Sequence, residues 1–137
     1  MTDNKNLEEA ALWFEAAQDD LDSGAILMMY KKHNHACLFA RLAVMKALKA
    51  LWFFHDTDPA KRRIPGLVRG LQKIDNNIFL KLTTYIDDLT MIDRWDSFGS
   101  PRVKESDKKE SDFFVNTAYK IITEVKTIIF ASGSSPF

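Results

Sequence analysis

The sequence has little cysteine, glycine or proline, and it carries no net charge. A single cysteine, Cys37, excludes an intramolecular disulfide and leaves a thiolate zinc site without a second cysteine ligand. The 19 basic and 19 acidic side chains cancel, which excludes the general polycation signature of nucleic-acid binders but leaves room for a local basic patch. No apolar run approaches the roughly 18–20 residues that span a bilayer, so we expect no membrane span.

The length and the first residues indicate a small protein of the cytoplasm. The opening residues MTDNKNLEEA lack a basic segment followed by an apolar one, which argues against secretion. The 137 residues correspond to one domain, and 46% hydrophobic with 28% charged residues is typical of a globular chain. We predict a single domain over residues 1–130, a flexible tail over residues 131–137 and a cytoplasmic location.

Two long segments without glycine or proline breakers predict a helical hairpin. Residues 5–30 repeat large apolar side chains every seven positions, with small side chains offset by three, which indicates a helix that a partner can approach closely. Residues 35–54 place alanines three and four positions apart, and Asn34 is the predicted N-cap. A turn over residues 31–34 then makes the two helices antiparallel neighbours.

The second half of the chain predicts the remaining helices. Residues 55–66 contain Asp-Pro and Pro-Gly, which mark a break. A short helix follows and ends near residues 75–77, and an apolar stripe over residues 78–92 predicts one further helix. After an exposed loop over residues 93–106, Ser106 or Asp107 opens the last helix. No segment alternates as a strand does, so the fold class is all-α: an antiparallel up-and-down bundle of four main helices plus a short helix.

Signatures of metal and cofactor sites are missing from the sequence. The five glycines are scattered, and no Glu-x-x-His pair occurs, so we predict no metal and no cofactor. His33 and His35 flank Asn34 and are a conceivable chelating pair. Because no carboxylate or further histidine lies at ligand spacing, we expect solvated turn histidines instead. His55 is expected to face the last carbonyls of the second helix.

Basic side chains gather at two places despite the neutral total. Lys46 and Lys49 lie three positions apart on the second predicted helix, and Lys61, Arg62 and Arg63 precede Pro65. One interpretation is an ordinary solvated surface. The other is a local phosphate-binding surface, with Lys46 and Lys49 as its candidate contacts.

Arg94 and Trp95 form a third candidate. The planar guanidinium of arginine suits phosphate, and the indole of tryptophan offers a face on which a base can stack. The flanking aspartates, Asp93 and Asp96, suggest the alternative that Arg94 pairs with them and serves as a structural latch.

Several motifs occur together in the order of a known family. The first helix carries an early tryptophan, an Asp-Leu pair and a tyrosine before a turn, namely Trp13, Asp20-Leu21 and Tyr30. The alanine-rich stretch AVMKALKAL follows at residues 43–51, the segment LVRGL at residues 67–71 and an Arg-Trp-Asp triplet at residues 94–96. In this combination the chain resembles the HEPN (higher eukaryotes and prokaryotes nucleotide-binding) family over about residues 10–130.

The resemblance implies a helical up-and-down bundle that often forms a dimer. Some members of this family are metal-independent RNases with an Arg-x(4–6)-His motif, others accompany small nucleotidyltransferases, and others are thought to bind nucleotides. Arg94 supplies the arginine, but no histidine lies C-terminal of residue 55. Met45 also replaces a glutamate of the family's second helix. Because histidine is the natural acid–base group near neutral pH, the resemblance implies a chain that has lost the usual RNase chemistry.

We therefore predict a non-catalytic HEPN-like homodimer. It would bind a nucleotide, RNA or a protein partner such as a small nucleotidyltransferase, in a toxin–antitoxin-like context, with Arg94, Trp95, Lys46 and Lys49 as contact residues. One alternative is a metal-independent RNase with an atypical active site, in which His35 lies near Arg94. Another is a purely structural or interaction module.

Overall fold

A computed structural model of the protein describes residues 4–95 and 106–130. These residues form helices and, within the described ranges, no strand. The helices are α1 (Asn4–Met29), α2 (His33–Phe54), α3 (Ile64–Ile74), α4 (Asn76–Thr83), α5 (Ile86–Arg94) and α6 (Lys108–Phe130). The predicted tail over residues 131–137 and most of the predicted loop over residues 93–106 lie outside the described residues.

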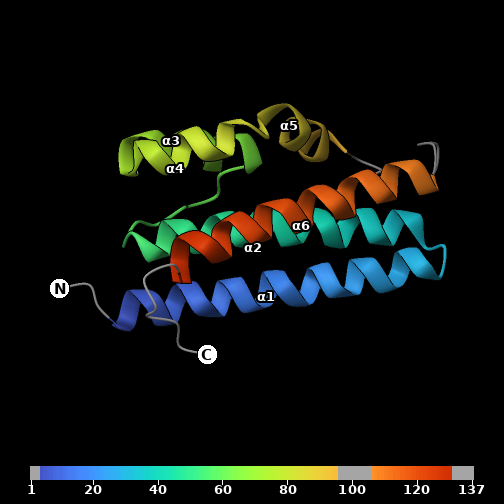
Figure 1. Ribbon diagram of the computed structural model, residues 1–137, viewed down its shortest axis with the longest axis horizontal. Coiled ribbons are helices and arrows are strands. Elements are labelled where there is room, and N and C mark those ends of the chain that lie inside the picture. Colours follow the sequence, from blue (N-terminus) through green and yellow to red (C-terminus); the bar gives the residue numbers. More distant parts are fainter. Residues whose placement is uncertain (1–3, 96–105, 131–137) are drawn as a thin grey trace.

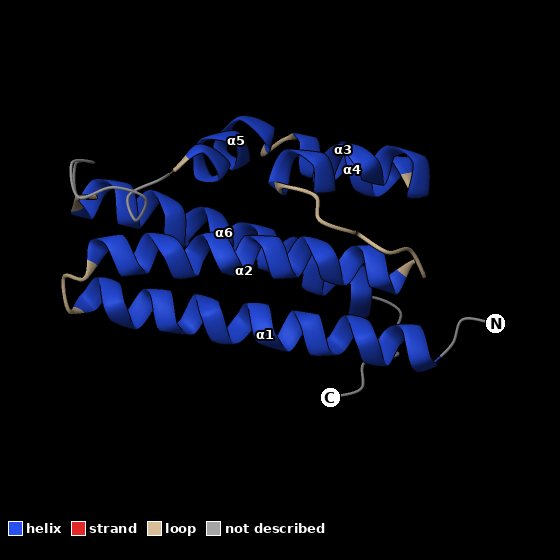
Figure 2. Ribbon diagram, turned by 180° about the vertical axis from the view of Figure 1, so that it is seen from behind, coloured by secondary structure: helices blue, strands red, loops and turns tan. Residues whose placement is uncertain are grey.

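The three long helices α1, α2 and α6 lie side by side along the long axis of the molecule (Figure 1). α2 and α6 run in the same direction, and α1 runs opposite to both (Figure 1). α3, α4 and α5 form a layer on the side away from α1 and carry the chain back to the end at which α6 begins (Figures 1 and 2). With these three short helices together making one pass, the predicted all-α up-and-down bundle is confirmed.

Small side chains bring α1 and α2 close together, as their spacing predicts. Ala10 and Ala17 of α1 are fully buried, and so are the alanines of the α2 seam, namely Ala36, Ala40, Ala43, Ala47 and Ala50. A Cβ atom added at Gly24 would lie 3.3 Å from the carbonyl oxygen of Ala36, which is tighter than ordinary packing. Glycine at position 24 therefore permits this close approach.

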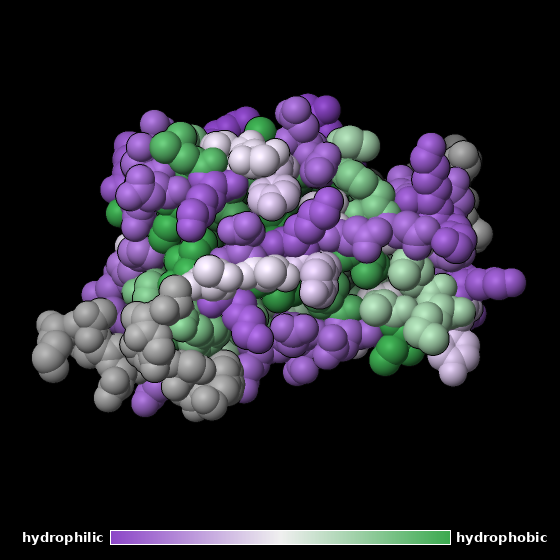
Figure 3. All heavy atoms as spheres, viewed as in Figure 1, coloured by the Kyte–Doolittle hydropathy of each residue, from purple (hydrophilic) through white to green (hydrophobic). Residues whose placement is uncertain are grey.

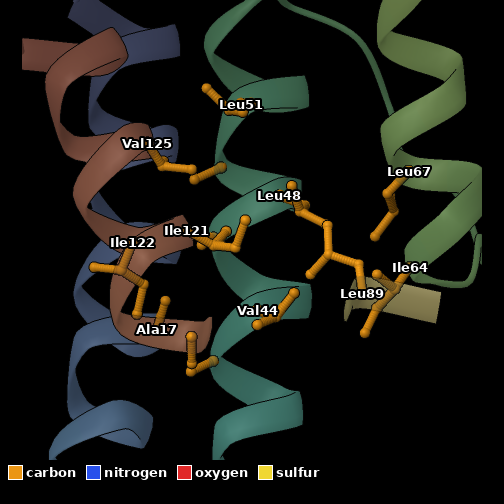
Figure 4. Close-up of a cluster of buried hydrophobic side chains, with 14 of the residues drawn as sticks. Ala17, Val44, Leu48, Leu51, Ile64, Leu67, Leu89, Ile121, Ile122 and Val125 are labelled. Atoms are coloured by element: carbon orange, nitrogen blue, oxygen red, sulfur yellow. The ribbon is translucent and has the colours of Figure 1, made fainter. Parts of the chain in front are cut away.

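The core extends from the α1–α2 contact to both neighbouring layers. Figure 4 shows α2 in the middle, with Ile121 and Val125 of α6 on one side and Leu67 and Leu89 of the short-helix layer on the other. These four side chains are fully buried. Burial of each large aliphatic side chain contributes about 1.5–3 kcal/mol to stability. Because α2 packs against buried side chains on both sides, it connects α6 to the layer of short helices.

α1 and α2 end in the same kind of turn. After α1, the backbone N–H of Lys31 donates to Met28 and that of Lys32 donates to Leu27, which is the Schellman pattern. After α2, Asp56 and Thr57 repeat the pattern with Phe53 and Trp52 as acceptors. Lys31 and Asp56 consequently adopt left-handed conformations, with φ of 61° and 54°, where glycine is the usual residue.

The start of α2 differs from the prediction. The helix begins at His33, Lys32 is the N-cap, and no side chain caps it. The predicted N-cap Asn34 lies inside the first turn, and its side-chain oxygen accepts a 2.6 Å hydrogen bond from the backbone N–H of Ser106 instead of capping α2. At the start of α6, in contrast, Asp107 caps the helix by accepting from the backbone N–H of Glu110 at 2.8 Å.

The stripe over residues 78–92 forms two helices, whereas one was predicted. The chain bends at Thr84 and Tyr85, between α4 and α5, without a glycine or proline to mark the break. The Thr83 hydroxyl donates to the carbonyl of Leu80, one of the local bonds by which threonine competes with helical hydrogen bonding. Buried side chains continue on both sides of the bend, so the apolar period alone conceals it.

Candidate functional site

The two lysines predicted to contact phosphate from the middle of α2 are engaged with α1. Lys46 Nζ lies 2.7 Å from a carboxylate oxygen of Asp20. Lys49 Nζ lies 5.3 Å from the ring centroid of Trp13, over the face of the indole. A lysine whose charge is matched by a carboxylate attracts phosphate less than a free one does. We therefore assign Lys46 and Lys49 to the contact between the helices and leave them out of the site proposed below.

Trp95 is a core residue and Arg94 is not. The Trp95 side chain is 8% exposed, packs edge to face against Phe114 and donates its indole N–H to the hydroxyl of Ser106 at 3.0 Å. A base could stack on this ring only if the indole left the core. Arg94 is exposed at the end of α5, so of the predicted pair only the arginine faces solvent.

The latch suggested for Arg94 is formed by a different arginine. Asp93 is paired with Arg63, whose Nε and Nη2 atoms lie 3.0 and 2.9 Å from one carboxylate oxygen. Arg63 also donates to the backbone carbonyl of Asp93 at 3.2 Å. This contact fastens the segment before α3 to the end of α5 and leaves Arg94 without its expected partner at position 93. The second expected partner, Asp96, lies outside the described residues.

A pocket of about 290 Å³ lies at the turn between α1 and α2. Two lysines, two histidines, an asparagine and a serine line it, namely Lys31, Lys32, His33, Asn34, His35 and Ser106. Both lysines and His35 are exposed. No carboxylate lines this pocket, so nothing in the lining neutralises the positive charge of the two lysines. A bound anion requires such unneutralised positive charge.

Ser106 connects the pocket to the end of α5. Its backbone N–H donates to Asn34, and its hydroxyl accepts from the indole of Trp95. The carbonyl of Trp95 in turn accepts a long, 3.5 Å hydrogen bond from Arg41 of α2. The start of α2, the start of α6 and the end of α5 therefore meet at one end of the bundle (Figure 1). Arg94 directly precedes Trp95 and so belongs to this end.

His33 is oriented by α6. The hydroxyl of Ser111 donates to the carbonyl oxygen of Lys108 at 3.1 Å, so its oxygen accepts from Nδ1 of His33 at 2.8 Å. This assignment places a hydrogen on Nδ1 and leaves Nε2 as the second ring nitrogen. Nε2 accepts a hydrogen bond when the imidazole is neutral and donates one, to a phosphate oxygen for example, when it is protonated.

A second, more apolar pocket of about 440 Å³ shares Lys31 and His33 with the first. Met28 and Met29 supply its apolar wall, and Lys108 and Asp112 complete it. These last two side chains pair with each other at 2.8 Å, so their charges are matched. The Lys108–Asp112 pair consequently adds no net charge to this second pocket, whose remaining cation is Lys31.

Cys37 lies next to this region but is not a nucleophile. Burial raises the pKa of its thiol from 9.0 to about 11, while a hydrogen bond with Ser106 acts in the opposite direction and the carboxylates of Glu110 and Asp107 raise it further. The thiol is therefore protonated at neutral pH, and the nucleophilic form is the thiolate. Cys37 is a fully buried packing residue.

Comparison with known proteins identifies the family. The HEPN domain profile matches residues 10–128, which is most of the chain. The chain belongs to the HEPN domain family. A crystal structure of a HEPN domain protein from Thermotoga maritima superposes with a TM-score of 0.66 at 25% sequence identity, covering 85% of this chain and 96% of that one. Among curated protein sequences, none matches.

Two further properties of the described residues bear on what this HEPN domain can hold. Within residues 4–95 and 106–130, no group of three or more histidine, cysteine, aspartate or glutamate side chains is arranged to hold a metal ion. None of the described helices is long and apolar enough to cross a membrane.

Sequence reasoning missed Lys31, Lys32 and His33 as members of the site. The run KKHNH is the most basic short stretch before residue 60, but solvated histidines are common in turns, and the sequence alone favours that interpretation. What distinguishes this turn is Ser106, more than 70 positions away in the chain, which closes one side of the pocket. No local pattern reports such a contact.

Proposed function

We propose that this HEPN domain binds RNA through its phosphates at the pocket of the α1–α2 turn and does not cleave it. The observation that carries the proposal is the lining of that pocket, which includes Lys31, Lys32, His33 and His35 but no carboxylate. Ammonium groups and imidazole N–H groups are donors that phosphate oxygens accept. The pocket is open to solvent on the side of its two exposed lysines, which a polymer requires.

Arg94 extends the proposed surface. It is exposed and lies one residue before Trp95, whose indole is bonded to Ser106 of the pocket. A polyanion held at the turn therefore has a guanidinium close to the same end of the bundle. The family resemblance supports RNA as the polyanion, and the missing histidine after Arg94 supports binding without cleavage.

The test is the affinity for a fluorescently labelled single-stranded RNA over a series of salt concentrations. Each lost phosphate contact should reduce the magnitude of the log–log salt slope by about 0.7, so replacing both Lys31 and Lys32 by glutamine should reduce it by about 1.4. At 0.1 M salt this corresponds to an affinity roughly 10- to 30-fold weaker.

The matched control is the double variant Lys73→Gln/Lys81→Gln. It removes the same charge from exposed positions on α3 and α4, outside the pocket. Equal loss in the two double variants would mean that RNA is attracted by charge in general, and the proposed site would be wrong.

A second candidate is a metal-independent RNase that uses His35 and Arg94. The observation in its favour is the chain of contacts from the pocket through Ser106 to Trp95, which brings the end of α5 to the end of the bundle that holds His35. This candidate predicts cleavage in the presence of a chelator, lost in both His35→Ala and Arg94→Ala. Intact RNA after prolonged incubation with concentrated protein would contradict it.

A homodimer, a nucleotidyltransferase partner in a toxin–antitoxin-like context and a cytoplasmic location stay predictions that rest on the family resemblance and the sequence. Light scattering after size-exclusion chromatography measures the oligomeric state directly. Co-purification with the product of an adjacent nucleotidyltransferase gene, where one is encoded, tests the partner. Stable monomers at all concentrations would remove the homodimer.

A further inference from the structure

The C-terminal end of α1 exposes apolar side chains next to the basic pocket. Among the described residues seven large hydrophobic side chains are exposed, and three of these, Ile26, Met29 and Tyr30, lie within the last two turns of this helix or directly after it. Figure 3 shows hydrophobic surface over this end of α1, bordered by hydrophilic side chains. Single exposed apolar residues need no explanation, but a cluster beside a cationic pocket does.

Tyr30 is the aromatic member of this cluster. Its side chain is 74% exposed, and it directly precedes Lys31, which lines both pockets. Consecutive Cα atoms are about 3.8 Å apart, so the backbone of Tyr30 directly adjoins that of Lys31 at the edge of the pocket. Trp95, the ring predicted to stack on a base, is in the core, whereas Tyr30 stands in solvent.

We infer that the α1–α2 turn recognises single-stranded RNA, with an unstacked base on the ring of Tyr30 and the neighbouring phosphate at Lys31 and Lys32. An exposed ring beside cations is the arrangement with which proteins hold single strands, because every base has a π-face. Bases in a duplex have both faces covered by their neighbours, so they offer no face to such a ring. This inference rests on the proposed RNA binding and specifies the kind of RNA.

The test compares three ligands of equal length: a single-stranded RNA, a strand with abasic positions throughout, and a duplex. Wild-type protein should bind the single-stranded RNA more tightly than either of the others. Tyr30→Leu should weaken binding of the single-stranded RNA about 5- to 150-fold, leave binding of the abasic strand unchanged and preserve the salt slope.

Two variants control for the hydroxyl group and for exposed tyrosines in general. Tyr30→Phe keeps the ring and should bind as wild type. Tyr119→Leu removes another exposed tyrosine, in α6 and outside both pocket linings, and should also bind as wild type. Thermal unfolding of each variant checks that the fold persists, which the exposure of both tyrosines leads us to expect.

The outcomes separate this inference from the proposed function. RNA binding that depends on Lys31 and Lys32 but is equal in Tyr30→Leu and wild type would overturn the stacking and leave the proposed function intact. Equal loss on the base-containing and abasic strands, or a loss in Tyr30→Phe as large as in Tyr30→Leu, would also overturn it. Absence of any salt-dependent RNA binding by the wild type would overturn both.

Discussion

The lysines in the middle of α2 and those at its N-terminal turn have the same chemistry and different surroundings. Lys46 is 32% exposed and paired with Asp20, and Lys49 lies over Trp13. Lys31 and Lys32 are exposed and line a pocket that has no carboxylate. One pair holds two helices together, and the other is free to meet an anion. Whether a lysine stabilises the fold or binds a ligand is decided by what faces it.

A second contrast lies along α2 itself. His33 and Cys37 are one turn apart, yet the histidine lines an open pocket whereas the thiol is completely buried. The boundary between the pocket lining and the core therefore passes between the first and second turns of this helix. We expect variants on the two sides of this boundary to behave differently, with the largest effect on stability at Cys37.

Cys37, on the core side of this boundary, should make the stability of the fold depend on pH. Its pKa is raised from 9.0 to about 11, so the folded state favours the neutral thiol. The resulting stabilisation is complete below pH 9 and is lost as the pH rises through 11, amounting to roughly 2–3 kcal/mol. Urea unfolding of wild type and Cys37→Ala at several pH values between 8 and 11 isolates this contribution. A stability difference between the two proteins that does not change over this range would contradict the prediction.

The Asp20–Lys46 pair should matter for stability and not for RNA. Asp20→Asn leaves a half-buried lysine unpaired, and we expect unfolding free energy to fall by about 1–2 kcal/mol, between the values for exposed and buried pairs. The single variants Lys31→Gln and Lys32→Gln should change it by less than about 0.5 kcal/mol. Chemical denaturation and RNA affinity, measured on the same variants, should rank them in opposite orders: Asp20→Asn loses the most stability and the Lys31 and Lys32 variants lose the most affinity. The same order in both measurements would contradict the distinction between the two pairs of lysines.

Lys31 and Asp56, the residues with left-handed backbone conformation after α1 and α2, should give the smallest change in stability and the sharpest test of the site. Replacing Lys31 or Asp56 by glycine relieves a positive φ but gives the unfolded chain more freedom, for a net gain of about 0.5–1 kcal/mol at most. The gain should be larger at Lys31, because aspartate tolerates this conformation better than lysine does. Only Lys31→Gly should also weaken RNA binding. Both variants binding RNA as wild type would show that the turn is not the site.

Much of the fold follows from local pattern. The stripe and small residues of α1 and the alanine seam of α2 predict the hairpin, because each depends on spacing within a few turns of one helix. The pair Ser106 or Asp107 predicts the start of α6, and the structure has Asp107 as the cap. The bend at Thr84 and Tyr85 escapes the pattern, since the apolar period continues across it. His55 does accord with its prediction: its Nδ1 lies 2.9 Å from the carbonyl oxygen of Leu51.

The sequence by itself determined the helical class, the antiparallel hairpin and the absence of any disulfide, because these depend on composition and on short-range spacing. Only the tertiary structure decided which basic groups are available. The pairs Asp20–Lys46 and Arg63–Asp93 and the contacts of Ser106 with Asn34 and Trp95 all join different elements, and three of these four are separated by at least 26 positions in the chain. Charge and burial at a site depend on such long-range neighbours, so the location of the pocket followed from packing and not from any motif.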